Sequence, residues 1–251
     1  MLEISCVMCY DCIIGNTKRK RSDRMKLLVV RHGEPNYEKD CLTENGRTQA
    51  QKLGERLNDV DIAAAYASSM GRASETARIA LDGRGIKITE CDWLRELNVG
   101  VHDPDIEGAV PAWDICPKNW TGIKNYYDLD TFAFAEGTSG TGIYERYETL
   151  KSGLDKMLAE HGLQRTGGYY HVTGSHDKTI ALFCHFGATC VVISHLLGIS
   201  PIVTLQGFSA EPTAIATLCT DDRFGADVNF RIHGFGDIHH IGGGIGSVNY
   251  K

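Results

Sequence analysis

The stretch LLVVRHG, residues 27–33, is the part of the sequence from which both the fold and the site can be predicted. Its first four residues are apolar with no polar alternation, which is typical of a central strand covered by helices on both faces. The strand leads directly into Arg31 and His32. Ligands bind at the carboxyl ends of strands in open parallel sheets. The stretch therefore predicts a buried strand that delivers an arginine and a histidine to a ligand site.

From residue 25 onward, short apolar runs alternate with amphipathic stretches, which is the pattern of strands and crossover helices in a largely parallel sheet. We expect strands at 27–30, 63–68, 180–185, 214–220 and 228–235, and helices at 43–57, 72–81, 144–158 and 188–197. The predicted fold is a three-layer α/β/α sandwich with a mostly parallel central sheet and a lid-like insertion.

Two segments depart from this pattern. Residues 1–24 are rich in cysteine and then basic, so we expect an N-terminal extension outside the fold, with residues 25–251 forming one domain. The alternation breaks down between about residues 99 and 137, around Trp113 and Trp120. A loop this long within a compact domain is usually functional. We therefore expect it to be the insertion in which substrate specificity resides.

The composition limits the partners and the compartment. Of 251 residues, 42% are hydrophobic and 23% are charged, as in ordinary globular proteins. The net charge of -6 attracts neither nucleic acid nor an anionic membrane, so neither is an expected partner. Nine scattered cysteines favour reduced thiols and a cytoplasmic protein. The oligomeric state stays open, a homodimer being one option.

Polar side chains gather at three strand ends. The strand at 63–68 leads into Arg72, and the strand at 180–185 ends at His185. If these strands neighbour the first one, both residues converge with Arg31 and His32, and the helices that follow add anion-binding N-termini. An imidazole can carry a phosphoryl group covalently, and the planar fork of arginine suits its oxygens. The pattern indicates phosphoryl chemistry.

A leaving alkoxide also needs a proton, which a nearby carboxylic acid can supply. Glu96, in the segment WLREL, is the candidate acid. The carboxylates of Glu34, Glu90 and Asp92 compete for this role.

Several motifs, taken in order, resemble those of the histidine phosphatase superfamily: LVVRHGE (28–34), LTENGRTQA (42–50), SSMGRASETA (68–77), LRE (94–96), EGTS (136–139) and FCHFG (183–187). The resemblance implies that His32 is the phosphorylated nucleophile and that Glu96 is the proton donor. It implies that Arg31, Arg72 and His185 bind the phosphate. It also implies that the reaction needs no metal and no cofactor.

The chain departs from the superfamily pattern at one phosphate ligand. Members with R-H-G-E-T-x-x-N carry an asparagine where Glu38 stands here, so Asn36 or Thr43 is expected to supply that hydrogen bond. Phe186 follows His185, where the family's other large branch has aspartate, and this favours the L-x-E branch.

The resemblance also bears on the reaction. The long loop of cofactor-dependent phosphoglycerate mutases is absent, because only residues 35–41 precede the L-T pair. We therefore expect a phosphomonoester hydrolase acting on a small phosphorylated metabolite, whose identity the sequence leaves open. A mutase and an inactive phosphate-binding module are the alternatives.

Three other groupings carry weaker signals. CVMCYDC (6–12) lacks the remaining ligand of an iron–sulfur site, and the histidines at 233, 239 and 240 lack a recognisable ligand spacing. GGGIG (242–246) lacks the strand-to-helix context of a nucleotide-binding loop. We expect no metal and no nucleotide at these places.

Overall fold

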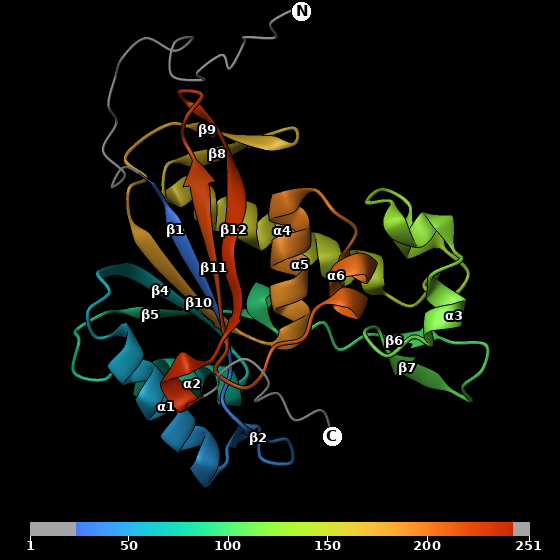
Figure 1. Ribbon diagram of the computed structural model, residues 1–251, viewed down its shortest axis with the longest axis horizontal. Coiled ribbons are helices and arrows are strands. Elements are labelled where there is room, and N and C mark those ends of the chain that lie inside the picture. Colours follow the sequence, from blue (N-terminus) through green and yellow to red (C-terminus); the bar gives the residue numbers. More distant parts are fainter. Residues whose placement is uncertain (1–23, 243–251) are drawn as a thin grey trace, which may run out of the picture.

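The computed structural model describes residues 24–242 as one eight-stranded sheet with helices on both faces (Figure 1). The spatial order of the strands is β5 (Ile88–Cys91), β4 (Ile62–Ser68), β10 (Thr179–Cys184), β1 (Lys26–Arg31), β11 (Ile215–Asp221), β12 (Asp227–Asp237), β9 (Tyr169–Val172) and β8 (Leu163–Thr166). Pairing is parallel from β5 to β1 and antiparallel from β1 to β8. Only β11 and β9 oppose the other strands, so the predicted mostly parallel sheet is confirmed.

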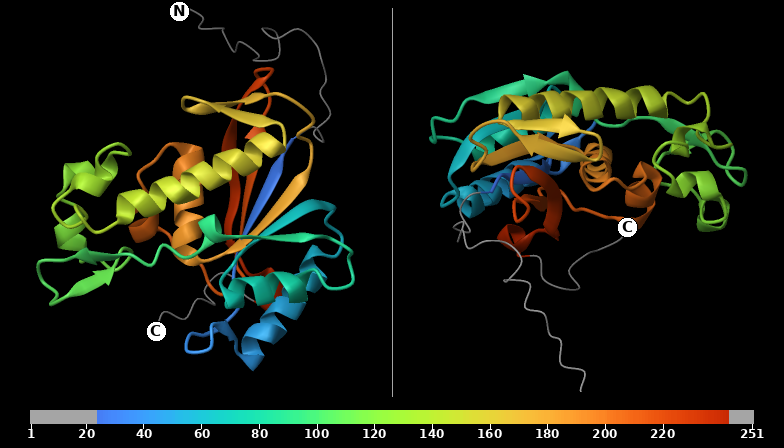
Figure 2. Two further views of the ribbon diagram at one scale, coloured as in Figure 1. Left: turned by 180° about the vertical axis from the view of Figure 1, so that it is seen from behind. Right: turned by 90° about the horizontal axis from the view of Figure 1, so that it is seen from above.

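Helices cover the sheet in two layers (Figure 2). One layer consists of α1 (Glu44–Leu57) and α2 (Gly71–Ala80); the other contains α4 (Ile143–Glu160), α5 (Phe186–Leu197) and α6 (Pro201–Gly207). The side chains of β1 alternate between them, since Leu27 and Val29 pack into one core while Leu28 and Val30 pack into the other. This accounts for the uninterrupted apolar run that predicted the strand.

The strands that carry the predicted site are immediate neighbours. β10 lies between β4 and β1 and is parallel to both. Arg31 is level with Cys184, and Phe183 is level with Ala67. The residues that follow these strands therefore emerge at one edge of the sheet, as the sequence predicted.

A small hairpin connects β1 to α1. It consists of β2 (Pro35–Asn36), β3 (Cys41–Leu42) and the turn between them. Leu42 N–H donates to Glu75 Oε2 at 2.7 Å, which attaches the hairpin to α2. The hairpin is therefore held beside the carboxyl end of β1.

The insertion at 99–137 contains β6 (Gly100–His102), β7 (Ala109–Pro111), α3 (Pro117–Trp120) and two 3₁₀ turns, Lys124–Tyr127 and Phe132–Phe134. Figure 1 shows it at one side of the molecule, beyond α6. Buried Asp103 organises it, accepting hydrogen bonds from the N–H groups of Asp105 and Cys116 and from Asn119 Nδ2.

Some predictions concern residues outside the described range, namely the N-terminal extension with CVMCYDC and most of GGGIG. Within residues 24–242, no helix is both long and apolar enough to span a membrane.

Candidate active site

His32 directly follows β1 and is 2% exposed. Its Nδ1 lies 2.7 Å from the carbonyl oxygen of Gly33. A carbonyl can only accept, so Nδ1 carries the proton and Nε2 is the unprotonated nitrogen that bears the lone pair. The pKa of His32 is lowered to about 3, mainly by burial and also by the charges of Arg31 and Arg72. At about pH 7 the ring is thus neutral, with Nε2 available as a nucleophile.

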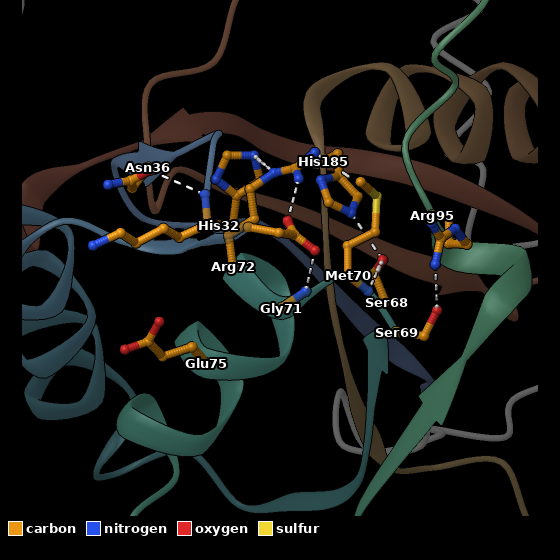
Figure 3. Close-up of polar contacts among 12 residues, drawn as sticks. His32, Asn36, Ser68, Ser69, Met70, Gly71, Arg72, Glu75, Arg95 and His185 are labelled. Atoms are coloured by element: carbon orange, nitrogen blue, oxygen red, sulfur yellow. Dashed lines mark hydrogen bonds and ion pairs between the residues drawn. The ribbon is translucent and has the colours of Figure 1, made fainter.

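Arg72 places its guanidinium against that nitrogen. Its Nε donates to His32 Nε2 at 3.2 Å, and the residue is 5% exposed. It is the second residue of α2, so the helix N-terminus brings it to the end of β4. Its Nη1 forms an ion pair with Asp40 Oδ1 at 2.6 Å. Figure 3 shows Arg72 and His32 together at the centre of the site.

His185 supplies a second imidazole. Its ring centre lies 5.1 Å from that of His32, nearly edge to face. Nε2 lies 2.8 Å from Ser68 Oγ, and Ser68 Oγ accepts from the N–H of Met70 at 3.2 Å (Figure 3). Nδ1 is buried and has no hydrogen-bond partner among residues 24–242. Burial lowers the pKa of His185, and the nearby His32, Arg72, Arg146 and Arg31 lower it further.

Arg31 approaches from the end of β1. Its Nη1 donates to the carbonyl of Ala210, and its guanidinium carbon lies 6.0 Å from the centre of the Phe186 ring. Its Nε is buried with no partner among the described residues. Its charge contributes to the lowered pKa of both histidines, so the four predicted residues share one electrostatic site.

Glu96 lies beneath the N-terminus of α5, the helix that begins immediately after His185. Its Oε1 accepts from the N–H groups of Leu97 at 2.7 Å and Ala188 at 3.1 Å. A Cβ on Gly187 would stand 2.7 Å from Oε1, so the close approach requires glycine. Burial raises the pKa of Glu96 despite these bonds, and the raised pKa suits a group that donates a proton.

The other candidate carboxylates, Glu34, Glu90 and Asp92, each accept hydrogen bonds from serine, threonine or asparagine side chains. Glu34 accepts from the side chains of Thr43 and Asn45 near the start of α1. Glu90 accepts from Ser74, and Asp92 accepts from Ser69. Glu96 is the carboxylate placed against the helix that carries His185.

The hairpin and the start of α1 hold the two other predicted phosphate ligands. Asn36 Oδ1 accepts from Lys39 N–H at 3.2 Å within the turn. Thr43 caps α1, because its hydroxyl accepts from Gly46 N–H at 3.0 Å and donates to Glu34 Oε1 at 2.8 Å. Their phosphate-binding roles stay predictions.

Sequence reasoning gave no role to Ser68 or Asp40. Ser68 could have been found, because it ends a parallel strand at the edge where the other site residues emerge. Asp40 carries no sequence signal, since its contact with Arg72 joins a turn to a distant helix. Of the C-terminal histidines, His239 pairs with Asp237, and His240 lies 2.9 Å from Thr213 Oγ1. No set of three metal-binding side chains is present within residues 24–242.

The family model described as the histidine phosphatase superfamily (branch 1) matches residues 27–228. A protein of Erwinia tasmaniensis named "Probable phosphoglycerate mutase GpmB" is 36% identical over 86 residues, which cover 31% of this chain and 40% of that protein. The protein of the same name from Yersinia enterocolitica is 34% identical over 151 residues, or 55% of this chain and 70% of the relative. The match to the first relative thus spans less than half of its length.

Solved structures share the fold. A mycobacterial glucosyl-3-phosphoglycerate phosphatase has a TM-score of 0.58 at 18% identity, covering 85% of this chain and 99% of that one. Phosphoserine phosphatase from Entamoeba histolytica, in complex with 3-phosphoglyceric acid, has a TM-score of 0.54 at 18% identity and covers 86% and 99%. At these identities the likeness shows the fold alone.

Proposed function

Because this chain belongs to the histidine phosphatase superfamily (branch 1), as its ordered motifs predicted, we propose that it is a phosphomonoester hydrolase that works through a phosphohistidine. The observation that carries the proposal is the state of His32. Its Nδ1 faces a carbonyl, and its unprotonated Nε2 faces the guanidinium of Arg72. A neutral imidazole beside a fixed cation suits attack on a phosphoryl group.

In the first step, Nε2 of His32 attacks phosphorus while the bond from phosphorus to the leaving oxygen breaks. Glu96 donates a proton to that oxygen, and the alcohol departs. In the second step, water attacks the phosphorus, Glu96 accepts a proton from the water, and the bond from nitrogen to phosphorus breaks. Inorganic phosphate leaves, and His32 and Glu96 return to their starting states.

Arg31, Arg72 and His185 stabilise the charge on the equatorial oxygens. Arginine donates paired hydrogen bonds to such oxygens, and fixed donors in a dry site act more strongly than in water. The buried Nε of Arg31 is a donor of this kind, as is Nδ1 of His185 when it carries the proton, and neither nitrogen has a hydrogen-bond partner among residues 24–242. These groups can provide the charge that a metal provides in other phosphoryl-transfer enzymes, so activity is expected to persist in a chelator.

The carboxyl of Glu96 supports the role of proton donor. Its raised pKa keeps a larger fraction protonated, and its bond to the N–H of Ala188 holds it at the start of α5, three residues after His185. The two backbone bonds both go to Oε1. Oε2 is then the oxygen that would exchange the proton.

The substrate is proposed to be a small phosphorylated metabolite, recognised by the insertion at 99–137. Trp113 packs on Phe186 with ring centres 5.8 Å apart, which links the insertion to the residue after His185. Gln206 Nε2 also donates to Ala112 O at 2.8 Å, fixing the insertion against α6. Changes in the insertion would therefore reach the leaving-group side of the site.

A phosphoglycerate-type mutase is the second candidate, because the curated relatives carry that name. The two activities differ in the fate of the phosphoryl group, which goes to water in one and back to a substrate hydroxyl in the other. The short hairpin between His32 and α1 favours the hydrolase.

The test is a panel of phosphorylated metabolites assayed for phosphate release, with phosphoglycerate isomerisation followed in parallel. We expect release from at least one metabolite and loss of activity in His32→Ala. Isomerisation without release would establish the mutase instead. Retention of most of the activity in His32→Ala would remove the proposed mechanism.

A further inference from the structure

The carboxylate of Asp40 bridges two donors at the start of α2. Its Oδ1 accepts from Arg72 Nη1 at 2.6 Å, and its Oδ2 accepts from Gly71 N–H at 2.7 Å. Burial opposes the charged form, but the bonds from Gly71 and Arg72 outweigh it and lower the pKa of Asp40. Asp40 is therefore ionised and paired with Arg72 in the working pH range.

The backbone is arranged specifically for this contact. Asp40 has a φ of 45°, in the left-handed region that costs energy for a residue with a side chain. Gly71 lies so close that an added Cβ would stand 2.1 Å from the carbonyl oxygen of Asp40. The left-handed backbone at one position and the glycine at the other both serve this contact.

The hairpin that carries Asp40 is fixed to α2 independently of Arg72. Glu75 accepts from Leu42 N–H at 2.7 Å and from Arg47 Nε at 2.7 Å. These bonds place Asp40 on α2 without using the guanidinium. Asp40 thus belongs to a fixed frame and not to a loop that must open.

The three nitrogens of the Arg72 guanidinium each have a partner, and that of Nη2 is Met70 Sδ at 3.8 Å. Nη1 is held by Asp40, while Nε points at Nε2 of His32. Tyr37, also on the hairpin, lies over the guanidinium with its ring centre 5.4 Å from the central carbon. Contacts at one edge and on one face fix the plane and direct the remaining edge toward the nucleophile.

We infer that Asp40 is a positioning residue, which acts through Arg72 by aligning the guanidinium with the phosphoryl group on His32. This inference rests on the proposed function. The opposite reading is that Asp40 stands in the place of the phosphate and must leave before a substrate can bind. The attachment through Glu75 and the orientation of Nε favour alignment, and the two readings predict effects of opposite sign.

The test uses Asp40→Gly, because glycine accepts the positive φ and leaves room for a small carboxylate at Gly71 and Arg72. Steady-state kinetics and orthovanadate binding are measured with and without sodium formate, with sodium chloride matching the ionic strength. We expect kcat to fall by about tenfold or more, with a smaller change in KM, since misalignment acts mainly on the transition state. Formate should restore much of the loss in Asp40→Gly in a saturable manner, and should not activate the native protein.

Asp40→Asn and Glu75→Gln complete the set. Asparagine tolerates the left-handed backbone and retains an acceptor, so Asp40→Asn should lie between the native protein and Asp40→Gly. Glu75→Gln weakens the bond to Leu42 without removing a contact of Arg72 or leaving a space for a carboxylate, so formate should not change its kcat.

The inference is overturned if Asp40→Gly is as active as the native protein or more active, or if formate only competes with substrate. A loss of activity that formate does not restore would also overturn it. Orthovanadate binding distinguishes failure of the inference about Asp40 from failure of the proposed function. A native protein that binds vanadate but hydrolyses no phosphomonoester would refute the hydrolase proposal, while the effect of formate on vanadate binding would still test Asp40.

Discussion

The hydroxyl of Ser68 lies 2.8 Å from Nε2 of His185 and accepts a hydrogen bond from the N–H of Met70. Because that N–H already donates to it, the hydroxyl can turn its own proton toward Nε2. The proton of the neutral imidazole then lies on Nδ1, the nitrogen without a partner among the described residues. In this arrangement, Ser68 selects the tautomer of His185 that can donate to a phosphoryl oxygen.

Removing this hydroxyl should impair catalysis without unfolding the protein. We expect Ser68→Ala to lower kcat/KM by roughly ten- to hundredfold, since it removes the partner that orients His185, a proposed phosphate ligand. Ser69→Ala is the matched control, because the hydroxyl of Ser69 bonds to Asp92 and not to His185. Equal effects of the two substitutions would show that the contact with His185 does not matter.

The role of Glu96 predicts a dependence on the leaving group. Glu96→Gln should lower the rate by about a hundredfold or more for alkyl phosphates, whose leaving oxygen needs a proton. For p-nitrophenyl phosphate, which leaves without protonation, the rate of the first step should change by less than about threefold. Stopped-flow measurement of p-nitrophenol release would check this. A uniform loss across both substrates would argue that Glu96 only supports the N-terminus of α5.

The buried histidines predict that stability falls in acid. His32 has an ordinary pKa of 6.5 when unfolded but about 3 when folded, so between these values only the unfolded state takes up the proton. The full contribution of each such histidine to the free energy of unfolding should therefore be present above about pH 6.5. It should decrease toward pH 3 by about 1.4 kcal/mol per pH unit. Urea unfolding at a series of pH values measures the slope.

His32→Asn provides the control for this slope. The variant removes one titrating group, so its stability should fall less steeply with decreasing pH. An unchanged slope would mean that His32 does not titrate as its burial implies.

The insertion should depend on Asp103. Asp103→Ala leaves the N–H groups of Asp105 and Cys116 without their acceptor and removes one of the two acceptors of Asn119 Nδ2, which should cost about 1–3 kcal/mol and speed hydrogen exchange at residues 100–120. Asp105→Ala is the control, because its ion pair with Lys118 is exposed to solvent and should contribute little to stability. If specificity resides in the insertion, Asp103→Ala should raise KM for the preferred metabolite more than for p-nitrophenyl phosphate. Exchange as slow as in the native insertion would contradict this account.

The central parallel strands β1 and β10 could be predicted because they are buried and read as unbroken apolar runs, whereas the parallel edge strand β5 is only partly buried and was not predicted. β1, β4 and β10 lie where the sequence placed them, each with its polar terminus at the same edge. The edge hairpin of β8 and β9 was missed, although Gly167 and Gly168 between two short strands are a typical hairpin turn. Both strands are only partly buried, so they lack a strong apolar pattern.

The prediction of the site was limited by long-range contacts. Arg31, His32, Arg72 and His185 could be grouped, because adjacent parallel strands bring their carboxyl ends together. Asp40 could not, since its contact depends on a left-handed turn and on the absence of a side chain at Gly71. Thr43 is a different case, because it was predicted as a phosphate ligand by comparison with a family motif. In the structure its hydroxyl caps α1 by accepting from Gly46 N–H, which the motif alone does not reveal.

The most direct test is to detect the phosphoryl group on His32. The native protein and Glu96→Gln are incubated with a labelled phosphomonoester, quenched in denaturing alkali to preserve phosphohistidine, and digested for mass spectrometry. The account predicts an acid-labile phosphoryl group on the peptide containing His32, and none in His32→Ala. Turnover without that modification, or a phosphoryl group on any other residue, would contradict it.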